Sequence, residues 1–547
     1  YDTGKTIREG DPEVSEAVDF AAYYANTIPA DGSGFHPYGV VTVASPWNFP
    51  LSIPAGGVLA GLAAGNAVIL KPAPEAVAVA GEMVRVMWDA GVPRDVLQFV
   101  PCVDGSDSAR LITDRRVDAV ILTGSWETAQ LFLRWRPVLN LHAETSGKNA
   151  IVVTATADLD EAVADIVRSA FGHAGQKCSA ASLAIVESTV HDDPRFLRRL
   201  ADAVSSLDVG PAWDLRTTMG PLIRPPEGPL LDAFSELGPG ERWLVRPAPL
   251  DPDRYMWSPG VKVGVQPGSP FHMTECFGPV LGVMRAADLD EAIQLQNTPL
   301  FGLTAGLHAL DPEEIATWRE RVHAGNLYVN RGITGAIVRR QPFGGWKHSV
   351  VGAGAKAGGP NYVGSLGWWP TDVAGSVDAV SVDEFRSLCV RAWERMRRPV
   401  DFTGLVAESN AFRYVPLSRV LLCAGDGAGE VSVELAVAAA SACGVAVKVA
   451  RGGELASDEM AQALLRGSVD KVRLLGVVDE SVPRAALDAG LWVDDIPVAA
   501  NPEREVLRWV REQAVSETRH RHGNVTNRRP GLVPLGEGRP GHTSGHS

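Results

Sequence analysis

The sequence contains few cysteines and no excess of positive charge. Only six of its 547 residues are cysteine, and no two of them form a CxxC pair. Sparse, scattered cysteines are typical of a reducing compartment, so we expect a cytoplasmic protein without a disulfide framework. The formal net charge of −14 argues against nucleic acid or an anionic membrane as a main partner, because both bind basic surfaces.

One stretch has no charged residue at all. Residues 35–70 contain no Asp, Glu, Lys or Arg, which is longer than the roughly 20 residues that a transmembrane helix needs. Four prolines interrupt the stretch, at Pro37, Pro46, Pro50 and Pro54. We therefore interpret it as buried core of an α/β domain and expect no membrane span. The sequence begins at Tyr1 and shows no signal-peptide pattern. Because the first residue is not Met, we expect the true N-terminus to be missing.

Short apolar segments alternate with helical patterns along the first third of the chain. We predict strands at Val40–Ala44 and at residues 67–70, 96–100 and 117–122, with helices at 53–64 and 74–90. A further helix begins at Leu159, because apolar residues recur there at spacings of three and four. Continuous apolar strands separated by helices indicate a parallel sheet covered on both faces.

Three residues are candidates for chemistry. Cys178 lies in a loop of small residues that could present a thiol, and the alternative is an inert buried cysteine. Glu144 ends a predicted strand, at the edge of an α/β sheet where ligands bind, although a solvated turn acid also fits. Asn48 follows the first strand among apolar neighbours and could either donate to an oxyanion or shape a turn.

Two other strand ends carry groups suited to a phosphate or a ribose. Gly124 and Ser125 follow a strand and precede a helix, which is the arrangement of a phosphate cradle or of an ordinary turn. Lys71 also ends a strand, where it could reach a ribose or remain a solvated lysine. No metal site is predicted.

Taken together, the motifs resemble the aldehyde dehydrogenase superfamily over residues 1–365. In chain order they are Ser45-Pro46-Trp47-Asn48, Lys71, Thr123-Gly124-Ser125, Glu144, Cys178, Glu275-Cys276-Phe277-Gly278-Pro279 and Gln341-Pro342-Phe343-Gly344-Gly345. Residues 330–336 and 356–360 resemble the L-glutamate γ-semialdehyde dehydrogenases, also called pyrroline-5-carboxylate dehydrogenases. With its further C-terminal unit, the chain resembles the dehydrogenase half of bifunctional proline utilisation A proteins.

The resemblance implies a role for each motif residue. Cys178 would be the nucleophile, Glu144 the general base, and Asn48 with the Cys178 N–H group the oxyanion hole. The cofactor site would be lined by Ser45, Trp47, Lys71, Gly124, Ser125, Glu275 and Phe277. Ser179, Gly335 and Ala336 would hold the substrate carboxylate. The implied reaction is NAD-dependent oxidation of L-glutamate γ-semialdehyde to L-glutamate through a Cys178 thioester, the second step of proline catabolism.

The resemblance also implies an α/β fold with a Rossmann-type parallel sheet for NAD, an α/β catalytic domain and a degenerate Rossmann-like C-terminal domain. The expected boundaries are a partial NAD-binding domain at 1–146, the catalytic domain at 147–336, an anchor or oligomerisation flap at 337–365, a linker at 366–418, the degenerate domain at 419–519 and a disordered tail at 520–547. We expect part of the family's N-terminal portion to be missing. Glu430 stands where the third glycine of a dinucleotide fingerprint belongs, which argues against pyrophosphate binding there.

Some positions depart from the family pattern. Pro74, followed by Glu75, stands where a glutamate is frequent, residues 102–106 replace a glycine-rich turn, and Trp126 replaces a smaller residue. The choice between NAD and NADP therefore stays open.

We expect a homo-oligomer, fused to or channelling from an FAD-dependent proline dehydrogenase domain. Two alternatives are a catalytically silent assembly module of a larger proline-oxidising polypeptide and a dehydrogenase for another aldehyde.

Overall fold

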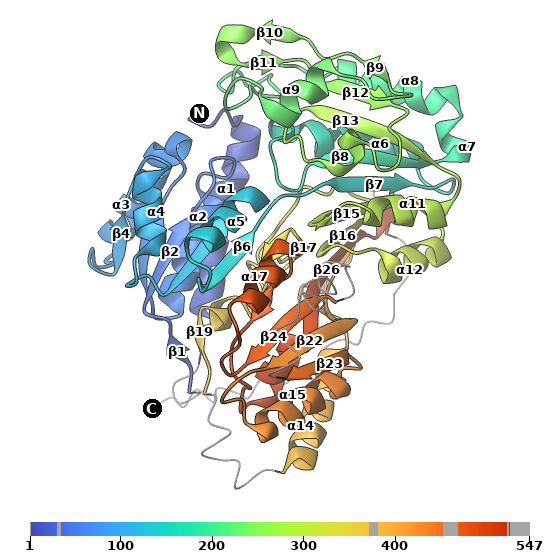
Figure 1. Ribbon diagram of the computed structural model, residues 1–547. Coiled ribbons are helices and arrows are strands. Elements are labelled where there is room, and N and C mark those ends of the chain that lie inside the picture. The colour runs from blue at the N-terminus through green and yellow to red at the C-terminus, as the bar shows by residue number, and fades with distance from the viewer. Residues whose placement is uncertain (1, 30–33, 371–380, 452–468, 522–523, 526–547) are drawn as a thin grey trace, which may run out of the picture.

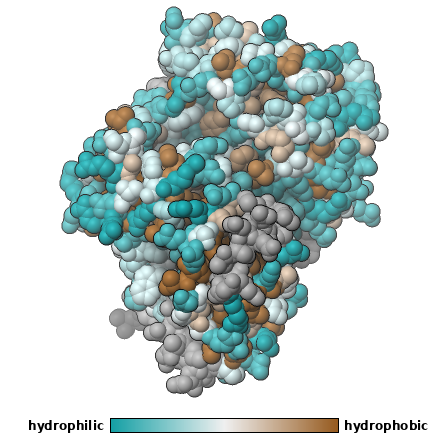
Figure 2. Space-filling view, viewed as in Figure 1, coloured by the Kyte–Doolittle hydropathy of each residue, from teal (hydrophilic) through white to brown (hydrophobic). Residues whose placement is uncertain are grey.

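A computed structural model places the chain in three α/β parts (Figure 1). It describes residues 2–29, 34–370, 381–451, 469–521 and 524–525. Most of the expected tail at 520–547 lies outside these residues. Hydrophilic residues cover most of the face in Figure 2, with apolar residues scattered singly or in small groups. No helix in the described ranges is long and apolar enough to cross a membrane.

The first part is built on a six-stranded sheet in the order β18-β6-β5-β2-β3-β4. Its parallel strands are β2 (Val40–Ala44), β3 (Ala67–Lys71), β4 (Leu97–Phe99), β5 (Ala119–Thr123) and β6 (Leu141–Glu144), and β18 (Val350–Val351) is antiparallel to β6. The chain order reverses between β2 and β5, as in a dinucleotide-binding half. The predicted strands are thus confirmed, and the uncharged stretch forms β2, β3 and the buried helix between them.

Helices cover this sheet on both sides. They are α1 (Ile7–Ala25), α2 (Ser52–Ala63), α3 (Val77–Asp89), α4 (Ser106–Thr113) and α5 (Trp126–Trp135). Helix α2 lies against β2 so closely that a Cβ at Gly57 would meet a Val43 methyl at 2.9 Å. Small residues in α2 therefore let the helix pack on the sheet, which explains why this segment is apolar yet is not a membrane helix.

The second part is a ten-stranded sheet in the order β20-β21-β26-β16-β15-β7-β8-β13-β12-β9. Seven strands come from the middle of the chain: β7 (Asn149–Val153), β8 (Ala181–Glu187), β9 (Arg242–Val245), β12 (Gly260–Val263), β13 (Val280–Ala286), β15 (Thr304–His308) and β16 (Asn326–Val329). Its helices are α6 (Leu159–Phe171), α7 (Ser188–His191), α8 (Pro194–Ser205), α9 (Gly228–Ser235), α10 (Pro270–Met273), α11 (Leu289–Asn297) and α12 (Pro312–Arg321). Helix α6 begins at the predicted Leu159.

The other three strands of that sheet come from the C-terminal third: β20 (Val400–Asp401), β21 (Glu408–Pro416) and β26 (Val510–Thr518). Strand β26 pairs in parallel with β16 on one side and antiparallel with β21 on the other. In Figure 1 it runs from the C-terminal unit into the catalytic sheet. The segment expected as a linker at 366–418 therefore contains sheet strands and a helix, α14 (Val382–Met396).

The third part is a four-stranded parallel sheet in the order β23-β22-β24-β25. Its elements are β22 (Arg419–Ala424), α15 (Glu430–Ala442), β23 (Ala446–Arg451), β24 (Lys471–Leu475), α17 (Ser481–Asp488), β25 (Val493–Asp494) and α18 (Pro502–Val506). Helix α14 packs on α15 and α18, and residues of all three share one apolar core. Part of the range expected as a linker thus belongs to the core of this unit.

The remaining short elements connect these parts. Strand β1 (His36–Pro37) pairs with β19 (Gly367–Trp368), β10 (Pro249–Asp251) with β11 (Met256–Trp257), β14 (Phe301–Gly302) with β17 (Trp346–Lys347), and β27 (His520–Arg521) with β28 (Asn524–Val525). The 3-10 turns are η1 (Pro74–Ala76), η2 (Gly172–Gly175), η3 (Pro252–Arg254), η4 (Val363–Ser365) and η6 (Leu507–Trp509).

The C-terminal unit also packs directly on the first part. Leu487 and Trp492 join an apolar cluster with Trp126 and Trp135 of α5. The ring of Trp126 in turn stacks on His348, with centroids 4.3 Å apart and planes 7° apart. Trp126, the large side chain that follows Ser125, therefore packs against the C-terminal unit.

Candidate active site

The loop that carries Cys178 is held in a strained shape. Before it, His173, Ala174 and Gly175 have positive φ angles of 52°, 53° and 67°. A Cβ at Gly175 would lie 2.4 Å from the carbonyl oxygen of Gly278, so only glycine fits there. Left-handed residues outside glycine are uncommon and concentrate at functional sites. The backbone is bent so that the thiol follows a tight turn packed on residue 278.

Asn149 fastens the same loop from the other side. Its Nδ2 donates to the carbonyl oxygens of Cys178 at 2.7 Å and Ala180 at 3.0 Å, while its Oδ1 accepts from the Thr304 N–H at 3.0 Å. Gly147 lets this contact form, because a Cβ there would lie 2.6 Å from the Cys178 carbonyl oxygen. The Gly147–Asn149 segment therefore fixes the position of the cysteine.

Two carboxylates face the thiol. The pKa of Cys178 is raised to about 12, mainly by burial and to a lesser extent by the nearby Glu275 and Glu144, while the N–H groups of Ser179 and Cys178 lower it. The sulfur is therefore a thiol in this state. A bound positive charge, or loss of its proton to a carboxylate, is needed before it can attack as a thiolate.

Asn48 meets the cysteine loop directly. It is 4% exposed, and its Nδ2 donates to the carbonyl oxygen of Gln176 at 2.9 Å. This contact uses one of the two amide hydrogens. Among the contacts of the described residues, the second hydrogen is left for a ligand. A carboxamide held beside a thiol in this way is suited to stabilise an oxyanion.

Glu144 lies at the end of β6, where it is paired with Val350 of β18. Its Oε2 accepts from the Gly345 N–H at 2.9 Å. Burial raises the pKa of Glu144 to about 8, although the cation of Lys356 and the Gly345 N–H both lower it. The residue is only half-buried, so water can reach it. A carboxyl group with this pKa can take a proton from water near neutral pH.

The residues expected to bind the cofactor gather where β2 and β5 end. Ser45 follows β2, and its N–H bonds the Lys71 carbonyl oxygen at 3.1 Å. Gly124 and Ser125 follow β5, and the Ser125 hydroxyl accepts from the Thr128 N–H at 3.2 Å, which caps α5. These groups meet at the reversal of strand order, the place where open α/β sheets bind dinucleotides.

Two buried oxygen atoms at this edge have no hydrogen-bond partner in the described part of the chain. They are Oγ of Ser45 and Oε2 of Glu75. Lys71 pairs with Asp104, whose side chain is largely exposed. Buried polar atoms without partners are costly, so they fit a bound group that carries hydroxyls. The residues present therefore suit a nucleotide.

The expected nicotinamide-side residues converge on the cysteine. Glu275 Oε1 accepts from the Gly147 N–H at 2.7 Å, and burial raises the pKa of Glu275 to about 7. The rings of Trp47 and Phe277 lie edge to face with centroids 5.9 Å apart. Glu275 lies near the Cys178 thiol, and the Trp47 ring also lies 6.1 Å from the ring of His173, five residues before the cysteine.

The expected carboxylate anchor lies on a loop tied to β16. The hydroxyl of Tyr328 donates to the Gly335 carbonyl oxygen at 2.5 Å, and Tyr328 also interacts electrostatically with Cys178. Ser179 is buried beside the cysteine, and Thr304 Oγ1 donates to its carbonyl oxygen at 3.3 Å. Gly335 is exposed and Ala336 is partly so. Tyr328 therefore lies near the cysteine and holds the loop that carries Gly335 and Ala336.

Sequence reasoning missed several residues of this site. They are Gly147, Asn149, Tyr328, Asn326, Lys356 and Glu512. Lys356 lies in the segment 356–360 that resembles the semialdehyde dehydrogenases, but the resemblance gave it no role. Gly147 and Asn149 follow Glu144 by three and five residues, and no role was predicted for them. Tyr328 and Glu512 gave no signal, since they reach the site only through strand pairing.

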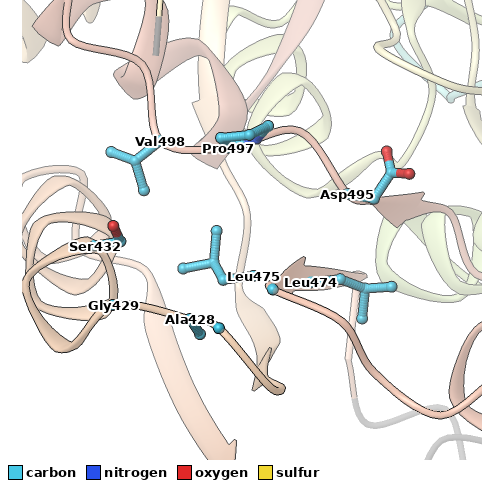
Figure 3. A pocket seen from close by; sticks show the side chains of 10 residues that line it. Ala428, Gly429, Ser432, Leu474, Leu475, Asp495, Pro497 and Val498 are labelled. Atoms are coloured by element: carbon cyan, nitrogen blue, oxygen red, sulfur yellow. The ribbon is translucent and has the colours of Figure 1, made fainter. Parts of the chain in front are cut away.

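A separate cavity lies in the C-terminal unit (Figure 3). It has a volume of about 210 Å³ and lies at the ends of β22 and β24. Its lining residues are Gly427, Ala428, Gly429, Ser432, Leu474, Leu475, Gly476, Asp495, Pro497 and Val498. The Glu430 carboxylate, expected to repel a pyrophosphate, is held by both terminal nitrogens of Arg451 at 2.6 Å.

Comparison with known proteins identifies the family. Residues 1–365 match the model of the aldehyde dehydrogenase family. The chain belongs to that family. Two curated relatives are 1-pyrroline-5-carboxylate dehydrogenases. The one from Geobacillus sp. (strain WCH70) is 36% identical over an alignment of 385 residues that covers 66% of this chain and 74% of the relative. The one from Bacillus subtilis (strain 168) is 35% identical over 388 residues, with the same coverage of 66% and 74%.

Solved structures extend this family assignment. Proline Utilization A from Corynebacterium freiburgense superposes with a TM-score of 0.87 and 46% identity over 96% of this aldehyde dehydrogenase family member. The chain spans 55% of the length of that protein. The 1-pyrroline-5-carboxylate dehydrogenase from Thermus with bound NAD superposes with a TM-score of 0.62 and 34% identity, over 67% of this chain and 75% of that one. The expected fold class is therefore confirmed.

Proposed function

We propose that this chain oxidises L-glutamate γ-semialdehyde, which equilibrates with pyrroline-5-carboxylate, to L-glutamate with NAD as the hydride acceptor. The observation that carries the proposal is the set of groups gathered at the Cys178 loop. Asn48 is hydrogen-bonded to the loop, Glu144 and Glu275 lie near the thiol, and Tyr328 holds the loop that carries Gly335 and Ala336. The names of the relatives favour the same substrate.

The first steps form a covalent adduct. A nearby carboxylate takes the Cys178 proton and passes it to solvent, and the sulfur forms a bond to the aldehyde carbon while the carbonyl π electrons move to oxygen. Asn48 Nδ2–H and the Cys178 N–H donate to that oxyanion. When bound, NAD would supply a positive charge and would accept the hydride. The adduct loses its C–H hydrogen with two electrons and becomes a thioester.

Hydrolysis then releases the product. Glu144 takes a proton from water as the oxygen bonds to the thioester carbon. The tetrahedral centre collapses, the C–S bond breaks, and its electron pair returns to Cys178 sulfur, which regains a proton. The new carboxylate is the γ-carboxylate of glutamate. Because the carbon is oxidised by two electrons only in the preceding step, this hydrolysis is redox-neutral.

The chain's own residues would hold the cofactor at the β2–β5 reversal. Ser45, Lys71 and the Gly124-Ser125 turn lie along one edge, and Glu275, Phe277 and Trp47 lie beside the thiol. Glu75 Oε2 has no partner among the described residues and can accept from ribose hydroxyls, which favours NAD. Its Oε1 pairs with Arg224, a cation that could bind a 2′-phosphate, so the assay with both cofactors decides between NAD and NADP. For the substrate, Ser179 and the N–H groups of Gly335 and Ala336 would bind the α-carboxylate.

We further propose that the chain acts with an FAD-dependent proline dehydrogenase domain, as its likeness to proline utilisation A proteins favours. Channelling from that domain would supply the semialdehyde. A cytoplasmic location agrees with six free cysteines, and we expect the chain to form a homo-oligomer.

The decisive experiment measures NADH formation by the full chain. Pyrroline-5-carboxylate and propanal are offered separately, each with NAD or NADP, and Cys178→Ala serves as the blank. We expect much higher kcat/KM for pyrroline-5-carboxylate with NAD. Equal rates with propanal would favour another aldehyde, and no NADH from either would favour the silent assembly module.

A further inference from the structure

The C-terminal unit places a carboxylate behind the candidate base. We propose that Lys356 and Glu512 are a positioning pair for Glu144: Lys356 favours its ionised form, and Glu512, supplied by β26, limits that effect. Neither residue contacts substrate or cofactor in this proposal. The inference rests on the role proposed for Glu144 and adds to it the groups that decide when the base carries its proton.

The Gly344-Gly345 turn lies between the side chains of Glu144 and Lys356, and both side chains contact its backbone. The Gly345 N–H donates to Glu144 Oε2 at 2.9 Å. A Cβ at Gly344 would lie 2.9 Å from Glu144 Oε1 and 3.1 Å from Lys356 Cγ. Lys356 Nζ donates to the Gly344 carbonyl oxygen and, at 2.9 Å, to Asn326 Oδ1. The ammonium group is thus anchored on the turn that holds the base.

Glu512 closes this arrangement from the far side. It is 7% exposed, and Lys356 is 1% exposed. Glu512 Oε2 accepts from the Lys356 N–H at 2.8 Å, and its Oε1 accepts from Asn361 Nδ2 at 2.8 Å. Trp346 Nε1 also donates to the Glu512 carbonyl oxygen at 2.8 Å. Three contacts therefore fix this residue of β26 against the segment that follows the Gly344-Gly345 turn.

The charges of this cluster do not balance, because it holds two carboxyl groups and one amine. Burial raises the pKa of both Glu144 and Glu512 and lowers that of Lys356. The Lys356 charge lowers the pKa of Glu144, and the Glu512 charge raises it. Two further titratable groups interact with Glu144, namely Cys178 and Tyr362. Both are neutral near pH 7, so the lysine and the second glutamate decide the balance.

Lys356 and Glu512 should therefore shift the pH dependence of thioester hydrolysis in opposite directions. The part of the pH–rate profile concerned is its acid limb, where the rate falls as Glu144 becomes protonated. The base works only when it is ionised, so thioester hydrolysis falls as pH drops below the pKa of Glu144. Lys356→Met removes a stabilising cation and should move this limb to higher pH. Glu512→Gln removes a competing anion and should move it to lower pH. An opposite charge within about 4–6 Å shifts a pKa by about 1–3 units. We therefore expect a shift of about one pH unit for Lys356→Met and a smaller one for Glu512→Gln, whose charge has the weaker effect on Glu144.

The experiment uses the full chain and two reactions. Oxidation of pyrroline-5-carboxylate tests the complete cycle. Hydrolysis of p-nitrophenyl acetate uses the same thiol and base without cofactor, so it separates failure of this inference from failure of the proposed substrate. Glu517→Gln is the matched control, since Glu517 also lies on β26 but pairs with Arg319 at 3.6 Å. Its limb should stay in place.

Limbs that move oppositely for Lys356→Met and Glu512→Gln support the pair, and Lys356→Arg should restore the original limb. Shifts in the same direction, or none, overturn the proposal, because a purely structural role would lower the rate at every pH. If Glu512→Gln does not fold, Asn361→Ala removes one donor to Glu512 and should give a smaller move to lower pH. An unmoved limb there also overturns it.

Discussion

Asn48 donates its side-chain amide to the carbonyl oxygen of Gln176, two residues before Cys178, at 2.9 Å. The bond joins the end of β2, in the nucleotide-binding sheet, to the cysteine loop of the catalytic sheet. One amide hydrogen of Asn48 thereby positions the loop, and in the proposed mechanism the other would donate to the oxyanion. Removal of the Asn48 side chain should affect rate more than cofactor affinity.

Asn48→Ala is expected to lower kcat by about 10²–10³-fold, the usual loss for one oxyanion donor. Acylation should slow, because the oxyanion forms there first. A stopped-flow measurement of the first NADH turnover checks this, with fluorescence titration of NAD binding beside it. A normal burst rate would remove Asn48 from the oxyanion hole.

Cys178→Ala should abolish turnover and leave NAD binding intact. The thiol makes the only covalent bond in the proposed cycle, and the cofactor edge of the sheet does not depend on it. Calorimetry with NAD and an NADH assay measure the two properties. In the native chain with NAD bound, iodoacetamide should label Cys178 before the other five cysteines, of which three are buried. Appreciable turnover by the alanine variant would sink the nucleophile assignment.

Glu144→Gln should slow hydrolysis of the thioester more than its formation. The pKa of Glu144 is raised to about 8, so the carboxylate form increases as pH rises through that value, and native hydrolysis should rise with it. The glutamine variant should lose this limb and about 10²–10⁴ in rate. Mass spectrometry after one burst should detect the trapped thioester. Unchanged turnover at neutral pH would mean that another group activates water.

Gly147→Ala tests the close contact behind the cysteine. The new methyl would lie 2.6 Å from the Cys178 carbonyl oxygen, so the loop must move and the thiol with it. A displacement near 1 Å can cost about 10²-fold in rate. Gly10→Ala is the control, because nothing lies within 4 Å of its Cβ, and it should keep native kcat. Similar kcat for both variants would show that the loop tolerates displacement.

Ala336→Leu addresses substrate choice. A larger side chain on the partly exposed anchor loop should block the α-carboxylate of the semialdehyde and raise its KM strongly. Charge-assisted hydrogen bonds contribute about 1.5–3 kcal/mol each, so loss of one corresponds to at least tenfold in kcat/KM. Propanal, which has no carboxylate, should be affected less. Equal loss for both substrates would place the anchor elsewhere.

The nucleotide-binding part was readable from local patterns. Val40–Ala44 forms a strand with the predicted bounds, and Glu144 does end a strand. These elements depend on short apolar runs and turn residues, which are local properties. Family motifs then supplied roles that periodicity alone left open.

The C-terminal contribution was less visible. Strand β26 buries Glu512, Gln513 and Ser516, so it lacks the apolar pattern by which central strands are recognised. Its partners in the sheet are distant in sequence, and α14 lies inside the range 366–418 that the sequence predicts to be a linker. Lys356 and Glu512 become a pair only through that pairing, which no local pattern reports.

The position of β26 between β21 and β16 also constrains how the protein folds during its synthesis. During synthesis β16 is complete long before Val510 emerges, so the ribosome-bound chain exposes an unpaired strand edge in its catalytic sheet. Such edges invite pairing with other chains, and the delay makes the final closure a long-range, slow event. Nascent chains of this protein should therefore need protection until their last strand is inserted.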